Sequence, residues 1–77
     1  MNLDILTPDK KLFEGTADSI TVPGTDGTLQ VLNNHAALIS SLAKGTIKVV
    51  SAEGEQNFPI LGGVIEVSKN KVIVLAE

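Results

Sequence analysis

Residues 46–75, TIKVVSAEGEQNFPILGGVIEVSKNKVIVL, are the stretch that decides the fold class of this chain. The stretch contains four runs rich in β-branched and aliphatic residues, at 47–50, 58–61, 64–67 and 72–75. Segments that favour turns separate these runs, at 52–55, 62–63 and 68–71. Short strands at near-regular spacing are typical of a β-sandwich or a β-barrel. The stretch therefore predicts an all-β fold.

Two features inside this stretch indicate where a sheet ends and where it bends. Pro59 has no backbone N–H to donate to a neighbouring strand, so we expect it on an edge strand or at a bulge. Gly62 and Gly63 allow the backbone to bend sharply between two runs. We therefore expect a corner between two sheets at this glycine pair.

The N-terminal half continues the strand pattern. Residues 3–6 and 18–22 alternate apolar with polar side chains, and turn residues follow each run. Residues 28–32 resume the alternation after Gly27, which can adopt a positive φ. We expect 18–22 and 28–32 to pair as a hairpin.

Only residues 35–42 have a spacing that a helix could use. Eight residues are marginal for a helix, and Ser40 and Ser41 lie inside them, so we expect a loop or bulge that leads into another strand. No linker, repeat or low-complexity segment interrupts the chain. Residues 1–77 therefore predict a single all-β domain, either a sandwich or a barrel.

The composition excludes several classes of function. The chain has no Cys, Trp or Tyr, only two Phe and one His, and a formal net charge of −3. It therefore offers neither aromatic platforms nor a basic stripe for a nucleic acid, and no thiolate nucleophile or cysteine-ligated zinc. The N-terminus does not resemble a signal peptide, and no apolar run approaches the ~20 residues that cross a bilayer. We expect a protein that stays inside a cell and meets a membrane only through a partner.

His35 is the only histidine and lies in an otherwise apolar and small-residue run, residues 28–41. A metal site needs further His or Cys ligands or converging carboxylates, and a catalytic triad needs more than a Ser close in sequence. The acidic residues fall in expected turns or on polar faces of strands. We therefore expect no catalytic residue, no metal site and no cofactor, and we expect His35 to form a local hydrogen bond or lie at a surface.

One alternative function involves Lys69, which lies at an expected hairpin tip. Small acidic β domains of about this length can carry a lipoyl or biotinyl group on a hairpin lysine, although the usual flanking Asp or Met is absent here. Lys69 and Lys71 are also typical of charges that solubilise a turn and prevent edge pairing. The alternative is a free-standing carrier domain with a prosthetic group on Lys69.

Two longer stretches resemble the epsilon subunit of the rotary F-type ATP synthase. Residues 27–38 follow the pattern Gly-x-Leu-x-apolar-apolar-x-x-His-Ala-x-Leu, and residues 62–76 begin Gly-Gly-apolar-apolar-Glu-Val and end Val-x-Val-Leu-Ala. The resemblance implies a ten-stranded, two-sheet β-sandwich that is a non-catalytic subunit at the foot of the central stalk. There it would couple the gamma subunit to the rotor ring of c subunits during proton-driven ATP synthesis, on the cytoplasmic side of a bacterial plasma membrane.

The resemblance also implies which residues contact partners. The turn at 25–28 and the neighbourhood of the histidine would face the rotor ring and gamma, and the serine after it would lie on the gamma side. The predicted partner-binding residues are Thr25, Asp26, Gly27, Thr28, His35 and Ser40. The family usually has Pro-Gly before the histidine, where this chain has Asn33-Asn34, and an acidic residue is common in place of Thr28.

Family members usually continue into a C-terminal helical hairpin that can extend and brake ATP hydrolysis. The sequence here stops at Glu77. We expect a coupling subunit in which the C-terminal helical domain, and autoinhibition by it, are absent.

Overall fold

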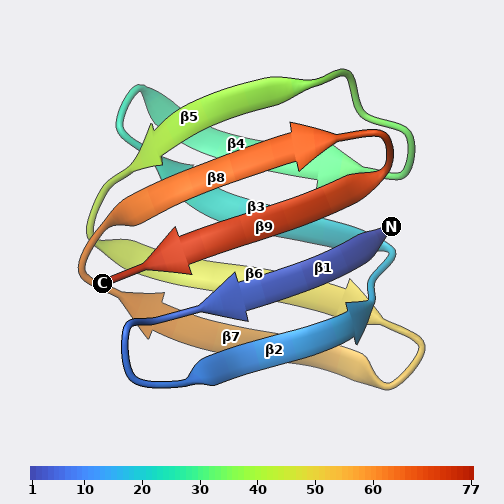
Figure 1. The fold of residues 1–77 in the computed structure, drawn as a ribbon, viewed down its shortest axis with the longest axis horizontal. Coiled ribbons are helices and arrows are strands. Elements are labelled where there is room, and N and C mark those ends of the chain that lie inside the picture. The colour runs from blue at the N-terminus through green and yellow to red at the C-terminus, as the bar shows by residue number, and fades with distance from the viewer.

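Nine β-strands account for the regular structure of the computed structural model, which describes residues 1–77 (Figure 1). No helix of the length and apolarity needed to span a membrane occurs. The strands are β1 (Asn2–Leu6), β2 (Lys11–Thr16), β3 (Ser19–Gly24), β4 (Gly27–Leu32), β5 (Leu38–Leu42), β6 (Gly45–Ser51), β7 (Gly54–Ile60), β8 (Gly63–Ser68) and β9 (Lys71–Ala76).

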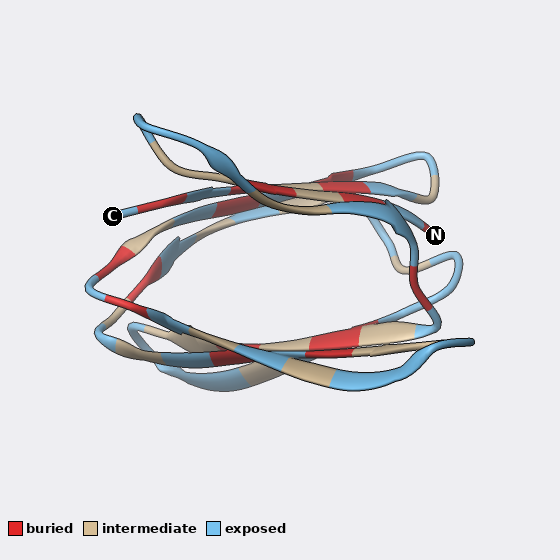
Figure 2. Cartoon of the chain, turned by 90° about the horizontal axis from the view of Figure 1, so that it is seen from below, coloured by how far each residue is buried: buried red, intermediate tan, exposed pale blue.

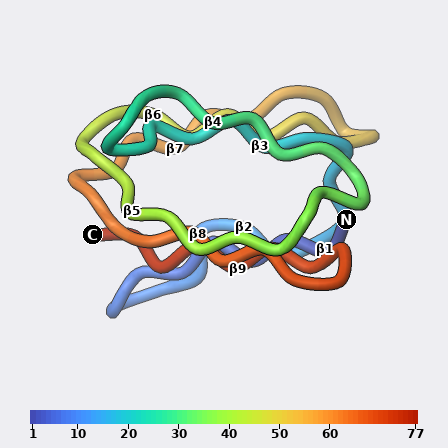
Figure 3. Tube along the Cα trace, turned by 90° about the horizontal axis from the view of Figure 1, so that it is seen from above, coloured from blue at the N-terminus to red at the C-terminus, as the bar shows by residue number.

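The strands lie in two layers that face each other (Figure 3). Layer A has the strand order β2-β1-β9-β8-β5, and layer B has the order β4-β3-β6-β7. A single bridge between Gly24 and Leu42 joins the layers along one side. On the other side, β2 and β7 end the path of paired strands without pairing to each other. The result is a sandwich that is nearly closed into a barrel.

Every strand pair is antiparallel except β1 with β9. The first and last strands run parallel, from Asn2 opposite Lys71 to Leu6 opposite Leu75. Because β9 also pairs with β8, the last strand fills the centre of layer A.

The buried residues lie in both layers (Figure 2), and together they form a core that is entirely apolar. Every second residue of most strands points inward, as the alternation predicts: Leu3 and Ile5 are 1% and 0% exposed, and no polar or charged side chain is buried. Each fully buried aliphatic side chain contributes roughly 1.5–3 kcal/mol to folding by leaving water. The ten largest fully buried side chains are Leu3, Ile5, Ile20, Ile47, Ile65, Val22, Val31, Val49, Val72 and Val74.

Most of the expected elements are confirmed. The hairpin of 18–22 with 28–32 is the β3–β4 pair, and the four C-terminal runs correspond to β6, β7, β8 and β9. Pro59 lies on β7, which pairs only with β6 and is therefore an edge strand. Gly62 and Gly63 form the corner at which the chain passes from layer B to layer A.

Three expectations differ from the structure. There are nine strands and not ten. Residues 35–37 are a loop, as expected, but the strand that follows begins earlier than expected, at Leu38, because five consecutive residues pair with β8 despite the serines. The strand β2 was not expected, since its sequence KLFEGT belongs to an edge strand that is half-exposed or exposed throughout and so shows no alternation.

Candidate functional site

The turn at residues 25–28 closes the β3–β4 hairpin and is fully exposed. Gly24 pairs with Gly27, and Gly27 adopts a φ of +128°, which a residue with a side chain rarely adopts. The N–H of Thr25 donates a hydrogen bond to the carbonyl oxygen of Ser41, 3.1 Å away. The turn is therefore fixed against the end of β5.

His35 lies at the opposite end of the sandwich, in the loop 33–37 between β4 and β5. Between the turn and this loop runs β4, and six residues of antiparallel strand span about 17 Å. The structure thus places Thr25 beside β5, whereas His35 lies far from the turn at residues 25–28. The predicted partner-binding residues fall into two separate surface regions.

The loop 33–37 is anchored by one hydrogen bond that Asn33 accepts and one that Asn34 donates. The Oδ1 of Asn33 accepts a hydrogen bond from the α-amino group of Met1, which also donates to the carbonyl oxygen of Ala17 at 3.0 Å. The N–H of Asn34 donates to Oδ1 of Asn70 at 2.8 Å. These bonds hold the loop against the N-terminus and the β8–β9 hairpin.

The setting of Ser40 follows from the alternating burial of β5. The burial of β5 alternates, with Leu38 and Leu42 packed into the core and Ile39 and Ser41 exposed. Ser40 is half-buried and shares the inward side with the two leucines, so its exposed neighbours Ile39 and Ser41 form the outer surface here.

The outer face of layer A carries an apolar row that crosses three strands. Leu6 on β1 pairs with Leu75 on β9, which pairs with Val64 on β8. Leu75 and Val64 are 55% and 39% exposed. We call Leu6, Leu75 and Val64 the outer apolar row. A surface depression of about 470 Å³ lies over it, lined also by Thr7, Pro8 and Glu77.

The next row on this face mixes apolar with acidic residues. Asp4, Ile73, Glu66 and Ile39 are in register across β1, β9, β8 and β5. Ile39 is 71% exposed, the largest exposure of any large apolar residue in the chain. Sequence reasoning missed both rows because a run such as Val72 to Leu75 has no polar residue to mark which side faces outward.

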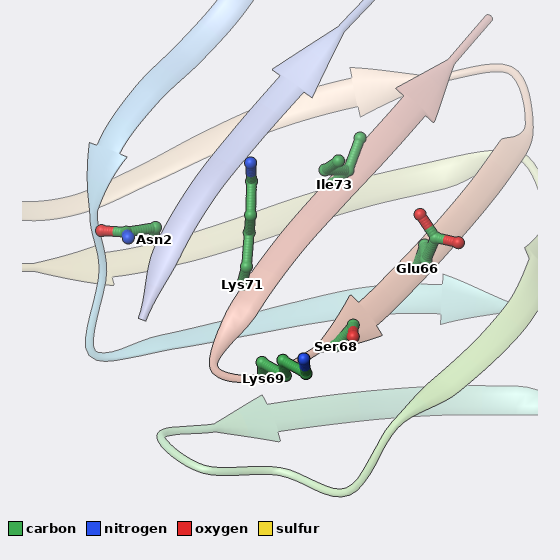
Figure 4. A pocket seen from close by; sticks show the side chains of 6 residues that line it. All are labelled: Asn2, Glu66, Ser68, Lys69, Lys71 and Ile73. Carbon is green, nitrogen blue, oxygen red and sulfur yellow. The ribbon is translucent and has the colours of Figure 1, made fainter.

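A second, polar depression lies further along this face, lined by Asn2, Glu66, Ser68, Lys69, Lys71 and Ile73 (Figure 4). Its side chains stand apart on the surface and do not converge on one point. Lys69 is exposed at the tip of the β8–β9 hairpin with a φ of +50°. No group of three or more His, Asp or Glu side chains is arranged to bind a metal ion. The only ion pairs, Lys11–Glu14 and Lys48–Glu55, are exposed.

Comparisons with known proteins agree on one family. The model of the ATP synthase delta/epsilon chain β-sandwich domain matches residues 1–77. The ATP synthase epsilon chain of Chlorobium limicola is 43% identical over 76 residues, which cover 97% of this chain and 86% of that protein. The epsilon chain of Leptospira borgpetersenii is 36% identical, and the match covers all of this chain but 61% of that longer protein.

The fold itself recurs in a solved structure. A chain of the Euglena gracilis mitochondrial ATP synthase, in a structure of OSCP, F1 and the c-ring, superimposes with a TM-score of 0.91 at 23% identity. The superposition covers 99% of this chain and 49% of that one. At such low identity the likeness supports the fold alone.

Proposed function

The chain belongs to the β-sandwich family of ATP synthase delta and epsilon chains, and from this membership we propose that it is a central-stalk subunit of a bacterial F-type synthase. Chains of this kind are non-catalytic. Its partners are the gamma subunit and the loops of the c-subunit rotor ring, and it couples the two during proton-driven ATP synthesis. It lies on the cytoplasmic side of the plasma membrane and meets the membrane only through the complex.

The observation that carries this proposal is the outer apolar row. Large apolar side chains exposed together on one face of a small domain mark a surface that a partner covers. Leu75 and Val64 lie beside each other in register, and Ile39 is exposed on the same face, opposite Glu66 of β8. We propose that the gamma subunit covers this face of layer A.

The charges on the same face indicate the chemistry of the covering surface. Asp4 and Glu66 flank Ile73 in register, and neither takes part in an ion pair within the chain. A complementary surface therefore presents aliphatic side chains and at least one Lys or Arg, since charged groups meet opposite charges across an interface.

The two surface regions suit a coupling role. We propose that Thr25, Asp26, Gly27 and Thr28 contact the rotor-ring loops, and that His35 and Ser40 contact gamma. The sandwich between them is stiff, because 39 of its 48 backbone hydrogen bonds lie within the strands. A block of this kind passes force from one region to the other through shape and contact, with no bond-making chemistry.

These 77 residues contain no helix, so a helical brake is not among them. We propose that they support coupling and do not inhibit ATP hydrolysis by themselves.

Co-purification with a tagged gamma subunit from the same source tests the function. Leu75→Lys places a charge in the outer apolar row, whereas Leu61→Lys places the same charge on a side chain that is 70% exposed at the β7–β8 corner. The wild-type chain and Leu61→Lys should form the complex, and Leu75→Lys should lose roughly tenfold or more in affinity.

Circular dichroism must show that both variants are folded. Equal binding by folded Leu75→Lys and wild type would contradict the assignment of this face. An added lipoyl or biotinyl mass on the chain from its native source would favour the carrier function on Lys69 instead.

A further inference from the structure

Three hydrogen bonds hold the loop that carries His35. Its start is tied to Met1 through the side chain of Asn33, and the N–H of His35 donates to the carbonyl oxygen of Leu32 at 3.2 Å. Its middle is tied to the β8–β9 hairpin, because the N–H of Asn34 donates to Oδ1 of Asn70. These hydrogen bonds therefore hold the backbone of the loop in one conformation before any partner binds.

Asn70 suits this task because of its own backbone. Lys69 and Asn70 form the two-residue turn of the hairpin, with φ values of +50° and +59°. Asn tolerates this left-handed conformation better than most residues, and its short side chain can reach a neighbouring backbone group. Asn34, the residue that it holds, is also left-handed, with a φ of +64°.

The ring of His35 is fixed by the carbonyl oxygen of Ala36, which lies 2.7 Å from Nδ1. A carbonyl oxygen can only accept a hydrogen bond, so Nδ1 must carry a proton. When the ring is neutral, Nε2 then has a free lone pair. The ring is half-buried, and the chain supplies no hydrogen bond to Nε2.

We propose that His35 presents Nε2 as a fixed hydrogen-bond acceptor to a donor group of the neighbouring stalk subunit, with Asn70 as the residue that positions its loop. The identity of that subunit as gamma rests on the function proposed above. Any N–H or O–H group of that subunit can supply this donor.

The state of the ring can be tested on the free chain. Long-range proton–nitrogen NMR spectra of ¹⁵N-labelled histidine distinguish the two neutral tautomers. The proton should reside mainly on Nδ1, whereas a ring with its proton mainly on Nε2 would overturn the proposal. This result does not depend on any partner, so it separates a failure of this inference from a failure of the proposed function.

The acceptor is tested in the complex with gamma by two amide variants. In His35→Gln the side-chain oxygen can reach the position of Nε2, whereas the shorter amide in His35→Asn reaches only the position of Nδ1. We expect Gln to bind gamma nearly as well as the wild type and Asn to bind roughly 5- to 20-fold more weakly, the effect of one lost hydrogen bond. Equal affinities of the two variants would contradict the role of Nε2.

Asn70→Gly tests the positioning role, because glycine keeps the left-handed turn and removes the acceptor of the Asn34 N–H. Hydrogen exchange at the Asn34 amide should accelerate, while core amides such as that of Val74 keep their protection. Asn70→Asp retains an acceptor oxygen and should preserve the slow exchange. If the Asn34 amide exchanged equally slowly in Asn70→Gly, Asn70 would not position the loop.

Discussion

Phe13 on β2 and Phe58 on β7 meet edge to face, with ring centroids 6.3 Å apart and planes inclined by 70°. They are the only aromatic residues of the chain, and they lie on the two strands that no backbone pairing joins. Their contact links layers A and B where hydrogen bonds do not. The seam between β2 and β7 therefore depends on side chains alone.

Replacement of either ring should weaken the seam. Both phenylalanines are half-buried, so Phe13→Leu or Phe58→Leu should each lower the free energy of unfolding by about 1 kcal/mol. In the double variant the losses should be non-additive by about 0.5–1.5 kcal/mol, which is the typical energy of an aromatic pair. Urea denaturation of the four proteins measures this coupling, and strict additivity would show that the rings do not stabilise each other.

Gly63 and Gly27 are a matched pair of glycines that tests how closely the backbone approaches each position. Both have positive φ, but a Cβ on Gly63 would lie 2.3 Å from the carbonyl oxygen of Leu75, whereas a Cβ on Gly27 meets nothing within 4 Å. Gly27→Ala should cost only the backbone preference, about 1–2 kcal/mol. Gly63→Ala should cost clearly more, about 3 kcal/mol or above, because backbone atoms must also move. Thermal and urea unfolding compare the two, and equal losses would contradict the close approach at the corner.

Ile47 and Ile39 separate core packing from surface contact. Ile47 is 0% exposed and Ile39 is 71% exposed. Ile47→Ala should lower the free energy of unfolding by roughly 2–5 kcal/mol, and Ile39→Ala by less than about 0.5 kcal/mol. Ile39→Ala should weaken binding to gamma more than Ile47→Ala does, when binding is measured below the melting temperatures of both variants. A large stability loss in Ile39→Ala would mean that this side chain belongs to the core.

The exposed turn should affect a different partner from the outer apolar row. Asp26→Lys reverses a charge in the turn, and because this residue lies on the hairpin between β3 and β4, the core should be unaffected. We expect weaker binding to detergent-purified rotor rings and unchanged binding to gamma. Leu75→Lys should give the opposite pattern. Identical effects of both variants on both partners would contradict two separate contact regions.

The 77 residues should not brake ATP hydrolysis. When they are added to an ATPase core that lacks this subunit, the hydrolysis rate should stay within about twofold of the core alone, a change of less than about 0.5 kcal/mol in the activation barrier. Strong suppression of hydrolysis would contradict this, provided that co-purification shows the chain bound to the core.

The alternation of apolar and polar residues was enough to predict most strands and the inward side of each. It failed for β2, whose residues are half-exposed or exposed on both sides at the edge of layer A. It also failed for β5, where serine takes inward and outward positions alike. Edge strands are held by pairing with their neighbours, and pairing leaves no periodic signal in a single sequence.

The surface was harder to predict than the core. The sequence shows that Val64 and Leu75 are apolar. A continuous apolar run, however, does not distinguish a strand that is covered on both faces from a strand with one exposed apolar face. The Asn34–Asn70 contact joins residues 36 positions apart, and no local pattern encodes such a bond. His35 could be expected at a surface from the lack of further ligands, but its tautomer follows only from the position of the Ala36 carbonyl.

The parallel pairing of β1 with β9 has a consequence for biosynthesis. Strands β1 and β8 flank a slot that only residues 71–76 fill, so layer A stays divided while the ribosome still holds that segment in its exit tunnel. Until then the nascent chain exposes two open strand edges beside aliphatic surface, which is the condition that invites misassociation. Layer A is thus completed only after the sixth and last residue of β9 has emerged from the ribosome.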